Sequence, residues 1–295
     1  MYTKEVLADQ LRDLGLKRGD VVNVKVSLRS IGGIDGGANA FIDAVLSVIG
    51  HEGTLVCDSF NETICRYTRI LHKNRVINDR TKSYAGAFVN AVLNHPQCYR
   101  SSHPLLAFSA IGRQAKELTQ SYTVESEPYG FLEEMANIGA VNLRIGDKVI
   151  GVGTTHVAIC KLGFQQKYIP NGIYYINADG EKCWYEHYWA SGCYKGFNKL
   201  FPYYREGGAV IGEGKIGNAN SMLTSMKETL RIEMDLFKKD GTAFFCKDPG
   251  CVNCAFTWRH SVYSYWQSAW YDIRKGDFKR LGYASLEALF GTWHK

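Results

Sequence analysis

The chain has 295 residues, of which 45% are hydrophobic and 22% charged, and its formal net charge is +6. This composition is typical of a soluble globular protein and excludes a disordered or fibrous chain. No apolar run could span a bilayer, and the amphipathic start of the chain contains acids, unlike a signal peptide, so we predict a cytoplasmic protein with reduced cysteines. The mild positive charge suits an anionic small-molecule ligand but is too weak to favour nucleic acid.

The first half of the sequence alternates helical and strand patterns. Helices are predicted over residues 3–14, 38–50 and 86–96, where apolar residues recur at helical spacing. Strands are predicted over residues 21–28, 53–60, 106–112 and 148–155. Strands that alternate with helices indicate an α/β fold with a mixed central sheet, flanking helices and a working surface at the strand ends.

The pattern changes after about residue 165. Residues 168–210 are rich in Tyr, Trp and Gly, which predicts antiparallel strands and long loops, and a helix is predicted near 219–238. The residues after this helix contain a group of cysteines and are interpreted as an extension of the main fold. We therefore predict a main domain over residues 1–240 and a C-terminal extension over residues 241–295 that packs on it.

Two stretches carry polar groups of the kind that bind phosphate. Residues 24–37 run from a strand through a glycine-rich turn into a helix, where backbone N–H groups and Arg29 could hold an anion. Residues 100–112 place Arg100, Ser102 and His103 directly before another strand. Both patterns also fit ordinary turns, and the glycine turn is neither a Walker motif nor a dinucleotide fingerprint.

Two further stretches are candidates for proton transfer. In residues 151–164 a Gly-Val-Gly strand end leads to His156, a candidate general base, and then to Lys161. In residues 183–189 Glu186 lies among aromatic residues, a setting that raises a carboxylate pKa and suits a proton acceptor. A helix-capping loop around His156 and a surface position for Glu186 are the structural alternatives.

The extension contains a candidate metal site. Cys246, Cys251, Cys254 and His260 have the close spacing and the ligand types of a tetrahedral Zn²⁺ centre. Since there is one C-x-x-C pair rather than two, reduced structural thiols and redox chemistry remain alternatives. Cys193 is a rival for the fourth ligand position.

In order and spacing, these stretches resemble the aminoglycoside 3-N-acetyltransferase family, the antibiotic N-acetyltransferases. The resemblance covers roughly residues 6–238. It is carried by the run from LGLKRGD to LVCDSF and by RSSHPLLAFSAIG, EPYGFLEEMANIGAVNLRIG, VIGVGTTHVAICKLGF, WYEHY and KIGNANSMLTSM. It implies that an acetyl group passes from acetyl-CoA to an amine, and that a histidine oriented by a glutamate takes the amine proton.

The resemblance also implies roles for individual residues. Acetyl-CoA would lie along Ser27, Leu28, Arg29 and Ile31, with Ser102 and His103 nearby. The catalytic histidine of the family aligns with Lys161, the histidine of its first strand with Lys25, and its glutamate with Glu186. Lys161 could then pair with Glu186, which leaves Glu186, His156 or a desolvated Lys161 as the base; of these we favour Glu186, because it alone occupies a position that the family uses.

The expected function is therefore N-acyl transfer from acetyl-CoA to an amine of an amino sugar, an aminoglycoside or a similar metabolite. Residues 168–204 carry lysines beside their acids, so we favour a biosynthetic acceptor over antibiotic resistance. The alternatives are a non-catalytic CoA- or ligand-binding homologue that lost its base and, less favoured, a zinc-stabilised nucleic-acid module. The sequence predicts no membrane partner and leaves a homodimer open.

Overall fold

The computed structural model describes most of the chain. It covers residues 1–149, 151–164, 171–187 and 193–246, together with residues 248, 251, 254, 270, 273, 274, 276 and 278. Within these ranges no helix combines the length and the apolar composition that crossing a membrane requires.

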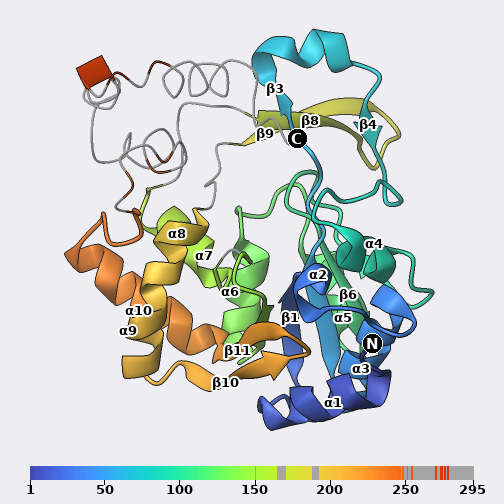
Figure 1. Ribbon diagram of the computed structural model, residues 1–295. Helices are drawn as coiled ribbons and strands as arrows, with labels where there is room; N and C mark the ends of the chain where they lie inside the picture. Colours follow the sequence, from blue (N-terminus) through green and yellow to red (C-terminus); the bar gives the residue numbers. More distant parts are fainter. Residues whose placement is uncertain are drawn as a thin grey trace.

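A seven-stranded mixed sheet forms the centre of the molecule (Figure 1). In spatial order its strands are β10 (Val210–Ile216), β11 (Ala219–Ser225), β7 (Val141–Ile145), β1 (Val21–Val26), β2 (Thr54–Asp58), β6 (Phe108–Gly112) and β5 (Tyr99–Arg100). β1 runs parallel to both of its neighbours, whereas β11 and β6 run antiparallel to theirs. This confirms the predicted α/β class with a mixed central sheet.

Side-chain alternation along the central strands gives the sheet two different faces. Val22 and Val24 of β1 are buried in one apolar core, while Asn23 and Lys25 point to the opposite face. Asp58 at the end of β2 follows the same alternation as Lys25, because Cys57 before it belongs to that first core. One face is therefore apolar, and the other carries a row of polar groups beneath the helices that cover it.

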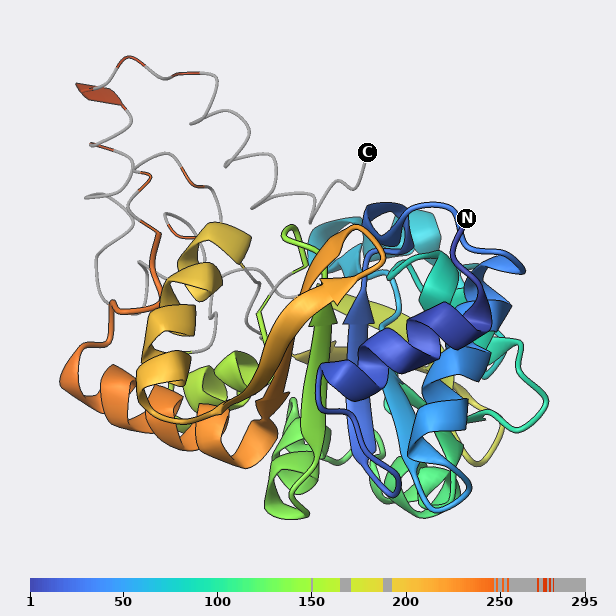
Figure 2. The ribbon, with the colours of Figure 1, turned by 60° about the horizontal axis from the view of Figure 1, so that its bottom comes forward.

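Helices cover both faces of the sheet. The apolar core that contains Val22 also includes the buried sides of α1 (Lys4–Asp13), α3 (Gly37–Ile49) and α4 (Ala87–Leu93). Figure 2 shows the blue α1 and α3 on this face and the orange α10 on the far side of the sheet. The other helices are α2 (Leu28–Ile31), η1 (Arg66–His72), α5 (Ala115–Ser121), α6 (Gly130–Asn137), α7 (Thr154–Lys161), α8 (Tyr194–Phe197), η2 (Asn198–Leu200), α9 (Phe201–Glu206) and α10 (Met226–Lys239).

Several predicted elements differ from the structure. The strand predicted over residues 148–155 is wrong: the strand is β7, and the Gly-Val-Gly segment after it leads into α7 at Thr154. The helix predicted from 219 begins at Met226, because residues 219–225 pair in the sheet and the Ser225 side chain caps the helix at the Glu228 N–H. Residues 194–206 form short helices rather than the predicted strands and loops.

A second, four-stranded sheet contains the predicted antiparallel pair of the aromatic segment. It consists of β3 (Ile64–Cys65), β8 (Asn171–Ile176), β4 (Val76–Ile77) and β9 (Lys182–His187). The hydroxyl of Tyr185 in β9 lies 3.2 Å from Nε2 of His103, which follows β5 of the main sheet. The small sheet is therefore joined to the main sheet at the edge where β5 ends.

Candidate active site

The strand directions bring several loops to one edge of the main sheet. β1, β2 and β7 are parallel to one another. β6 pairs antiparallel with both β2 and β5, so β5 runs in the same direction as these three strands. Their carboxyl ends meet at the same edge, which we call the carboxyl edge. In open α/β sheets ligands bind at this edge, where the chain connections diverge to either side.

Lys25 and Asp58 form an ion pair at the carboxyl edge. The Lys25 ammonium donates to Oδ2 of Asp58, and the two side chains are only 13% and 15% exposed. The other oxygen of Asp58, Oδ1, is buried and has no hydrogen-bond partner among the described residues. A buried carboxylate oxygen without a partner costs free energy, so this oxygen is a place where a ligand N–H could bind.

His156 lies in the first turn of α7, beside this ion pair. Its ring stacks on Tyr129 at a centroid distance of 4.6 Å and meets the edge of Phe197 at 5.3 Å. Its Nδ1 is buried and has no hydrogen-bond partner within the described ranges. Burial, and secondly the charge of Lys25, lower the pKa of His156 to about 3. The ring is therefore neutral at pH 7, and one of its nitrogens keeps a free lone pair.

Gly153 allows the close approach of α7 to β1. It caps the helix with a φ of +90°, and a Cβ there would lie 3.3 Å from Cε of Lys25 and 3.4 Å from Cδ1 of Leu132. A side chain at this position would be strained by its backbone and would press on Lys25. The glycine therefore places the first turn of α7 directly over the lysine.

Tyr129 supports His156 from an unusual backbone conformation. Its φ is 61°, and it is the one non-glycine residue in the described part of the chain that has a positive φ. Its ring is 1% exposed, and burial raises the pKa of its hydroxyl well above the usual value. A left-handed tyrosine costs roughly 1–2 kcal/mol of backbone strain, and such strain is concentrated at functional sites.

A second polar group holds the opposite side of the same helical turn. The hydroxyls of Thr155 and Tyr204 both lie 2.5 Å from Oε1 of Glu233, a fully buried residue of α10. Thr154 donates to Thr229 of the same helix at 2.9 Å. Burial raises the pKa of Glu233 to about 7, although the hydrogen bonds from Thr155 and Tyr204 oppose the shift. These contacts fix the turn that carries His156.

The structure separates the predicted partners Lys161 and Glu186. Lys161, the last residue of α7, is 44% exposed and pairs with Glu133 of α6. Glu186 of β9 is 17% exposed, accepts a hydrogen bond from Trp184 Nε1 at 2.9 Å and lies 3.3 Å from Nη1 of Arg66. The pairing predicted between Lys161 and Glu186 is therefore wrong, because each side chain is engaged on a different element.

The residues predicted to bind CoA lie at the carboxyl edge with different exposures. Ser27 directly follows β1 and caps the short helix α2, which buries Ile31 completely. Leu28 is partly buried, and Arg29 is exposed and forms no ion pair with any described residue. Arg29 is therefore the residue of this group that can reach an anionic ligand.

The loop after β5 contains one exposed and one buried candidate. Ser102 is exposed, whereas His103 is 1% exposed and accepts the backbone N–H groups of Leu105 and Leu106 at its Nδ1. The neighbouring Arg100 donates to backbone oxygens of the loops that contain Ser59 and Thr81. His103 and Arg100 thus shape the loop, and Ser102 is the one that a ligand can reach.

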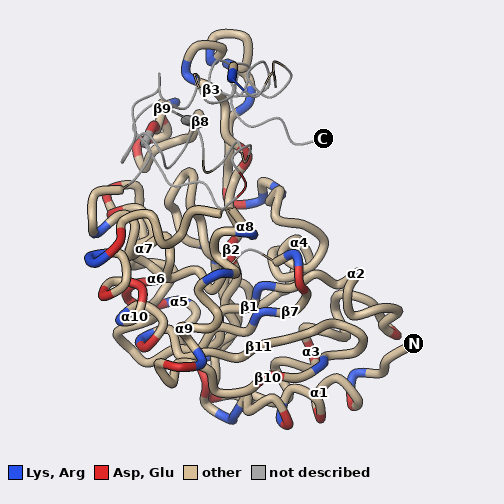
Figure 3. The backbone as a smooth tube through the Cα atoms, turned by 60° about the vertical axis from the view of Figure 1, so that its left-hand side comes forward, with Lys and Arg blue, Asp and Glu red and all other residues tan. Residues whose placement is uncertain are grey.

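The aromatic rings and the acid of the small sheet have positively charged neighbours. Arg69 lies over the ring of Trp184 at 5.8 Å, and Lys182 lies over Tyr174 at 4.5 Å. Figure 3 shows basic residues gathered around β3. The acid Glu186 is matched by Arg66, so the aromatic rings and the carboxylate of this sheet already have cationic neighbours.

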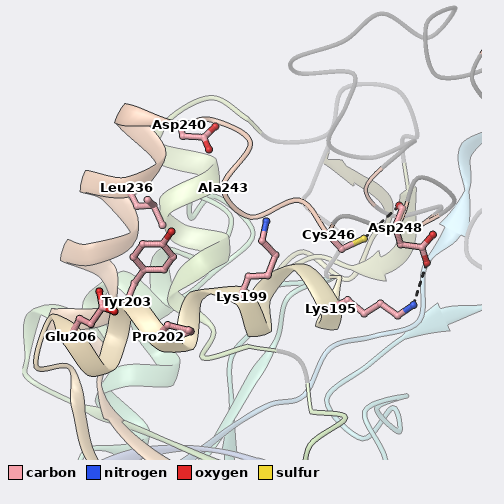
Figure 4. A pocket seen from close by; sticks show the side chains of 10 residues that line it. All are labelled: Lys195, Lys199, Pro202, Tyr203, Glu206, Leu236, Asp240, Ala243, Cys246 and Asp248. Carbon is pink, nitrogen blue, oxygen red and sulfur yellow. Dashed lines mark hydrogen bonds and ion pairs between the residues drawn. The ribbon is translucent and has the colours of Figure 1, made fainter.

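The structure brings together three of the four predicted metal ligands. Cys246, Cys251 and Cys254 lie in one group, and Cys193, the rival, is its fourth member. His260 lies outside the described residues. A shallow groove between α8–α9 and α10 borders this group and is lined by Lys195, Lys199, Tyr203 and Asp240, as Figure 4 shows. The residues that line this groove do not include His156 or Asp58.

Asp58 and Tyr129 belong to the site, but the sequence patterns alone do not point to them. Asp58 is the polar residue that ends a buried strand pattern, which was the available signal. Tyr129 gave none, because its role depends on a backbone conformation and on stacking with a residue distant in sequence.

The fold is an α/β fold of the antibiotic N-acetyltransferase type. The sequence profile of the aminoglycoside 3-N-acetyltransferase family matches residues 24–238, and the chain belongs to that family. This confirms the resemblance identified in the sequence.

Individual relatives of the chain support this family assignment. The chain is 27% identical over 256 residues to the SPbeta prophage-derived aminoglycoside N(3')-acetyltransferase-like protein YokD of Bacillus subtilis strain 168, covering 77% of this chain and 89% of that protein. The crystal structure of YokD matches with a TM-score of 0.70 and 25% identity, over 81% of this chain and 100% of that one.

Two further structures match at the level of the fold. Apo aminoglycoside acetyltransferase AAC(3)-IVa has a TM-score of 0.73 at 22% identity, over 88% of this chain and 97% of that one. A binary complex of AAC-IIIb with CoASH has a TM-score of 0.68 at 18% identity, over 81% of this chain and 97% of that one.

Proposed function

We propose that this protein transfers an acetyl group from acetyl-CoA to an amine of an amino sugar or a related metabolite, with His156 as the base. Membership of the acetyltransferase family supports the reaction type. The observation that carries the assignment of the base is the neutral imidazole of His156, whose Nδ1 has no hydrogen-bond partner among the described residues, beside the buried pair of Lys25 and Asp58.

The proposed reaction is a direct transfer. The amine nitrogen attacks the thioester carbonyl carbon, the new C–N bond forms, and the C–S bond breaks. The proton lost by the nitrogen passes to His156 and then to the departing sulfur, which leaves as the thiol of CoA. The base acts on the nitrogen after it has bonded to the carbonyl carbon, where the nitrogen is far more acidic than in the free amine.

His156 is a better candidate than Glu186 or Lys161. Lys161 is exposed and paired at the far end of α7, and Glu186 is held by Arg66 and Trp184 in the small sheet. His156 alone of the three has a buried ring atom without a partner among the described residues, next to charged groups at the carboxyl edge. We propose that Glu186 contributes to acceptor binding rather than to proton transfer.

Asp58 and Lys25 would divide two further tasks. Oδ1 of Asp58, which lacks a partner in the described part of the chain, would accept an N–H of the incoming amine and orient its lone pair towards the thioester. The Lys25 ammonium would stabilise the negative charge that develops on the carbonyl oxygen, and its charge adds to the effect of burial in keeping His156 neutral. Both effects act in a buried setting, where electrostatic interactions are strong.

For the cofactor, we propose that Arg29 and Ser102 contact CoA, Arg29 from the short helix α2 after β1 and Ser102 from the loop after β5. Both are exposed at the carboxyl edge, and an exposed arginine suits a phosphate group. CoA should then raise the unfolding temperature of the free protein, because a ligand that binds only the native state stabilises it. Arg29→Ala should reduce this shift, while Arg231→Ala, an exposed arginine on α10, should leave it unchanged.

The charge around the small sheet favours an acceptor with one amine over a polycationic aminoglycoside. Arg69 and Lys182 already cover the aromatic rings, and Arg66 neutralises Glu186. A ligand with several ammonium groups would be repelled by these cations. We therefore favour a monoamino sugar or a similar metabolite, with antibiotic acetylation as the second candidate.

A thiol-release assay with acetyl-CoA tests the proposal. The panel should contain monoamino sugars, simple amines and aminoglycosides, with Lys161→Gln as a matched control for the catalytic variants. We expect turnover with at least one amine and higher kcat/KM for singly charged acceptors. Release that is highest for aminoglycosides would reverse the order of acceptors. No release with any amine, while CoA still stabilises the protein, would favour a non-catalytic CoA-binding protein.

A further inference from the structure

Four cysteine side chains converge between α8 and the chain that follows α10. Cys193, Cys246, Cys251 and Cys254, here called the cysteine cluster, place their sulfur atoms within 4.8 Å of one another. Cys193 and Cys254 are only 3% and 1% exposed. Cys193 and Cys251 are 58 positions apart in sequence, yet their sulfur atoms lie 3.5 Å apart. The fold, rather than local sequence, therefore builds this cluster.

The spacing of the sulfur atoms fits a tetrahedral metal ion. A Zn–S bond of about 2.3 Å in a regular tetrahedron separates the sulfur atoms by roughly 3.8 Å. The cluster has its sulfur atoms within 4.8 Å, with one pair at 3.5 Å, so the required separation lies inside the observed range. A disulfide needs sulfur atoms about 2.05 Å apart, and all four cysteines are free.

The surroundings of the cluster favour thiolates. The backbone N–H of Gly196 donates to Sγ of Cys193 at 3.3 Å, and that of Cys246 donates to Sγ of Cys254 at 3.2 Å. N–H groups that point at sulfur stabilise the charged form and orient the ligands of a metal centre. Lys195 and Lys199 lie on the adjoining helices, where Figure 4 shows them beside Cys246. Lys195 is paired with Asp248, whereas Lys199 donates to the carbonyl oxygen of Phe245, so the charge of Lys199 would partly offset the net −2 charge of a zinc ion bound by four thiolates.

We propose that Cys193, Cys246, Cys251 and Cys254 bind one structural Zn²⁺ ion, with Cys193 in the fourth position instead of His260. Zinc bound by four protein ligands has no open position for a substrate, so this site stabilises the fold and takes no part in acetyl transfer. The ion would crosslink α8 to the segment after α10, which form one apolar core together.

This crosslink would reach the catalytic region through α8. Gly196 packs so closely on the backbone of residue 244 that a Cβ would lie 2.3 Å from its carbonyl oxygen. Phe197, the next residue, contacts the ring of His156 and lies against Gly151. The zinc ion would thus hold the aromatic side chain that packs on His156, and its loss should loosen that wall of the site.

Metal analysis of the full-length protein, purified without added zinc or chelator, tests the proposal. We expect about one equivalent of zinc per chain, and the visible absorption bands of a tetrahedral thiolate site after growth with Co²⁺. Cys193→Ser and Cys251→Ser should each lose the metal, whereas Cys98→Ser, a cysteine outside the cluster, should retain it. His260→Ala should also retain it, because His260 is not a ligand in this proposal.

Three results would overturn the proposal. Less than a tenth of an equivalent of zinc in folded wild-type protein would exclude a resident ion. A mass two units below that of the fully reduced chain would show a disulfide within the cluster, and iron in place of zinc would exclude the assigned metal. If the cysteine variants fail to fold, the metal content and the cobalt spectrum of the wild-type protein still decide the question.

Discussion

The His156 region and the cysteine cluster are both buried and polar, but they differ in whether their polar atoms have partners. In the described residues, four of the seven buried side-chain atoms without hydrogen-bond partners belong to Asn23, Asp58, Asn142 and His156. The sulfur atoms of Cys193 and Cys254, in contrast, accept backbone N–H groups and lie against other thiols.

This difference separates a site that handles substrates from a site that holds the fold together. A buried atom without a partner lowers stability, and it persists where a ligand or a reaction supplies the missing contact. A cluster whose polar atoms already have hydrogen-bond partners gains no missing contact from a substrate that binds and leaves. Such a cluster can still hold a permanently bound ion. The contrast therefore supports the two proposed roles, turnover for His156 and structural support for the cysteine cluster.

The largest expected effect comes from comparing His156→Gln with Glu186→Gln. Loss of a general base costs about 10²- to 10⁴-fold in rate, so His156→Gln should nearly abolish thiol release while CoA still stabilises the protein. Glu186→Gln should retain kcat and raise KM, because Glu186 belongs to the proposed acceptor surface. The opposite pattern, with kcat lost in Glu186→Gln and kept in His156→Gln, would transfer the role of base to Glu186.

Glu233 is intermediate between the His156 region and the cysteine cluster, because its Oε1 accepts hydrogen bonds while its Oε2 has no partner among the described residues. Its pKa of about 7 exceeds the usual 4.5, so the folded state holds a proton that the unfolded state releases. Wild-type stability should therefore fall as the pH rises from about 4.5 through 7. The expected loss between pH 5 and pH 8 is about 2–3 kcal/mol, and Glu233→Gln should remove it.

Urea denaturation of wild type and Glu233→Gln at these two pH values measures the effect. Glu228→Gln changes a partly exposed glutamate of the same helix, which is paired with Arg231; it is the matched control and should keep the wild-type dependence on pH. Equal slopes of stability against pH in wild type and Glu233→Gln would show that Glu233 does not titrate in this window.

The smallest expected effect is a change in the pH profile of Lys25→Met. In the wild type His156, with a pKa of about 3, stays neutral above about pH 4 and adds no acid limb between pH 5 and pH 9. Removing the Lys25 charge should raise the pKa of His156, so activity would begin to fall at a higher pH as the solution is acidified.

We also expect kcat/KM of Lys25→Met to fall roughly tenfold, because one stabilising charge is lost from the transition state. Lys25→Arg, which keeps the cation, should leave the position of the acid limb unchanged. An acid limb in Lys25→Met identical to that of Lys25→Arg would mean that the lysine does not influence His156.

Much of the fold could be predicted because its information is local. Helical spacing identified α1, α3 and α4, and alternating or apolar runs identified β1, β2 and β6. The boundary errors arose where a short apolar run fits two structures. Residues 219–225 have the pattern of a helix start, but pairing with β7 makes them a strand.

The site was less predictable because it depends on contacts between distant residues. His156 and the three C-terminal cysteines stood out by residue type and spacing. The stacking of Tyr129, the unpaired oxygen of Asp58 and the inclusion of Cys193 follow from packing alone. The alignment of Lys161 with the catalytic histidine of the family also failed to locate a site, because sequence position does not reveal that Lys161 ends α7 on its exposed side.

The alternation along β1 limits how this protein can change over evolution. Val22 and Val24 fill one core, while Asn23 and Lys25 face the helices of the site. Exchanging one aliphatic residue for another at Val22 or Val24 alters only the packing. Inserting or deleting a single residue reverses every side chain beyond it, which would bury a lysine under α3 and remove the cation from the site. Variation in chain length should therefore be absent from β1 among functional descendants, even where its apolar residues are freely exchanged.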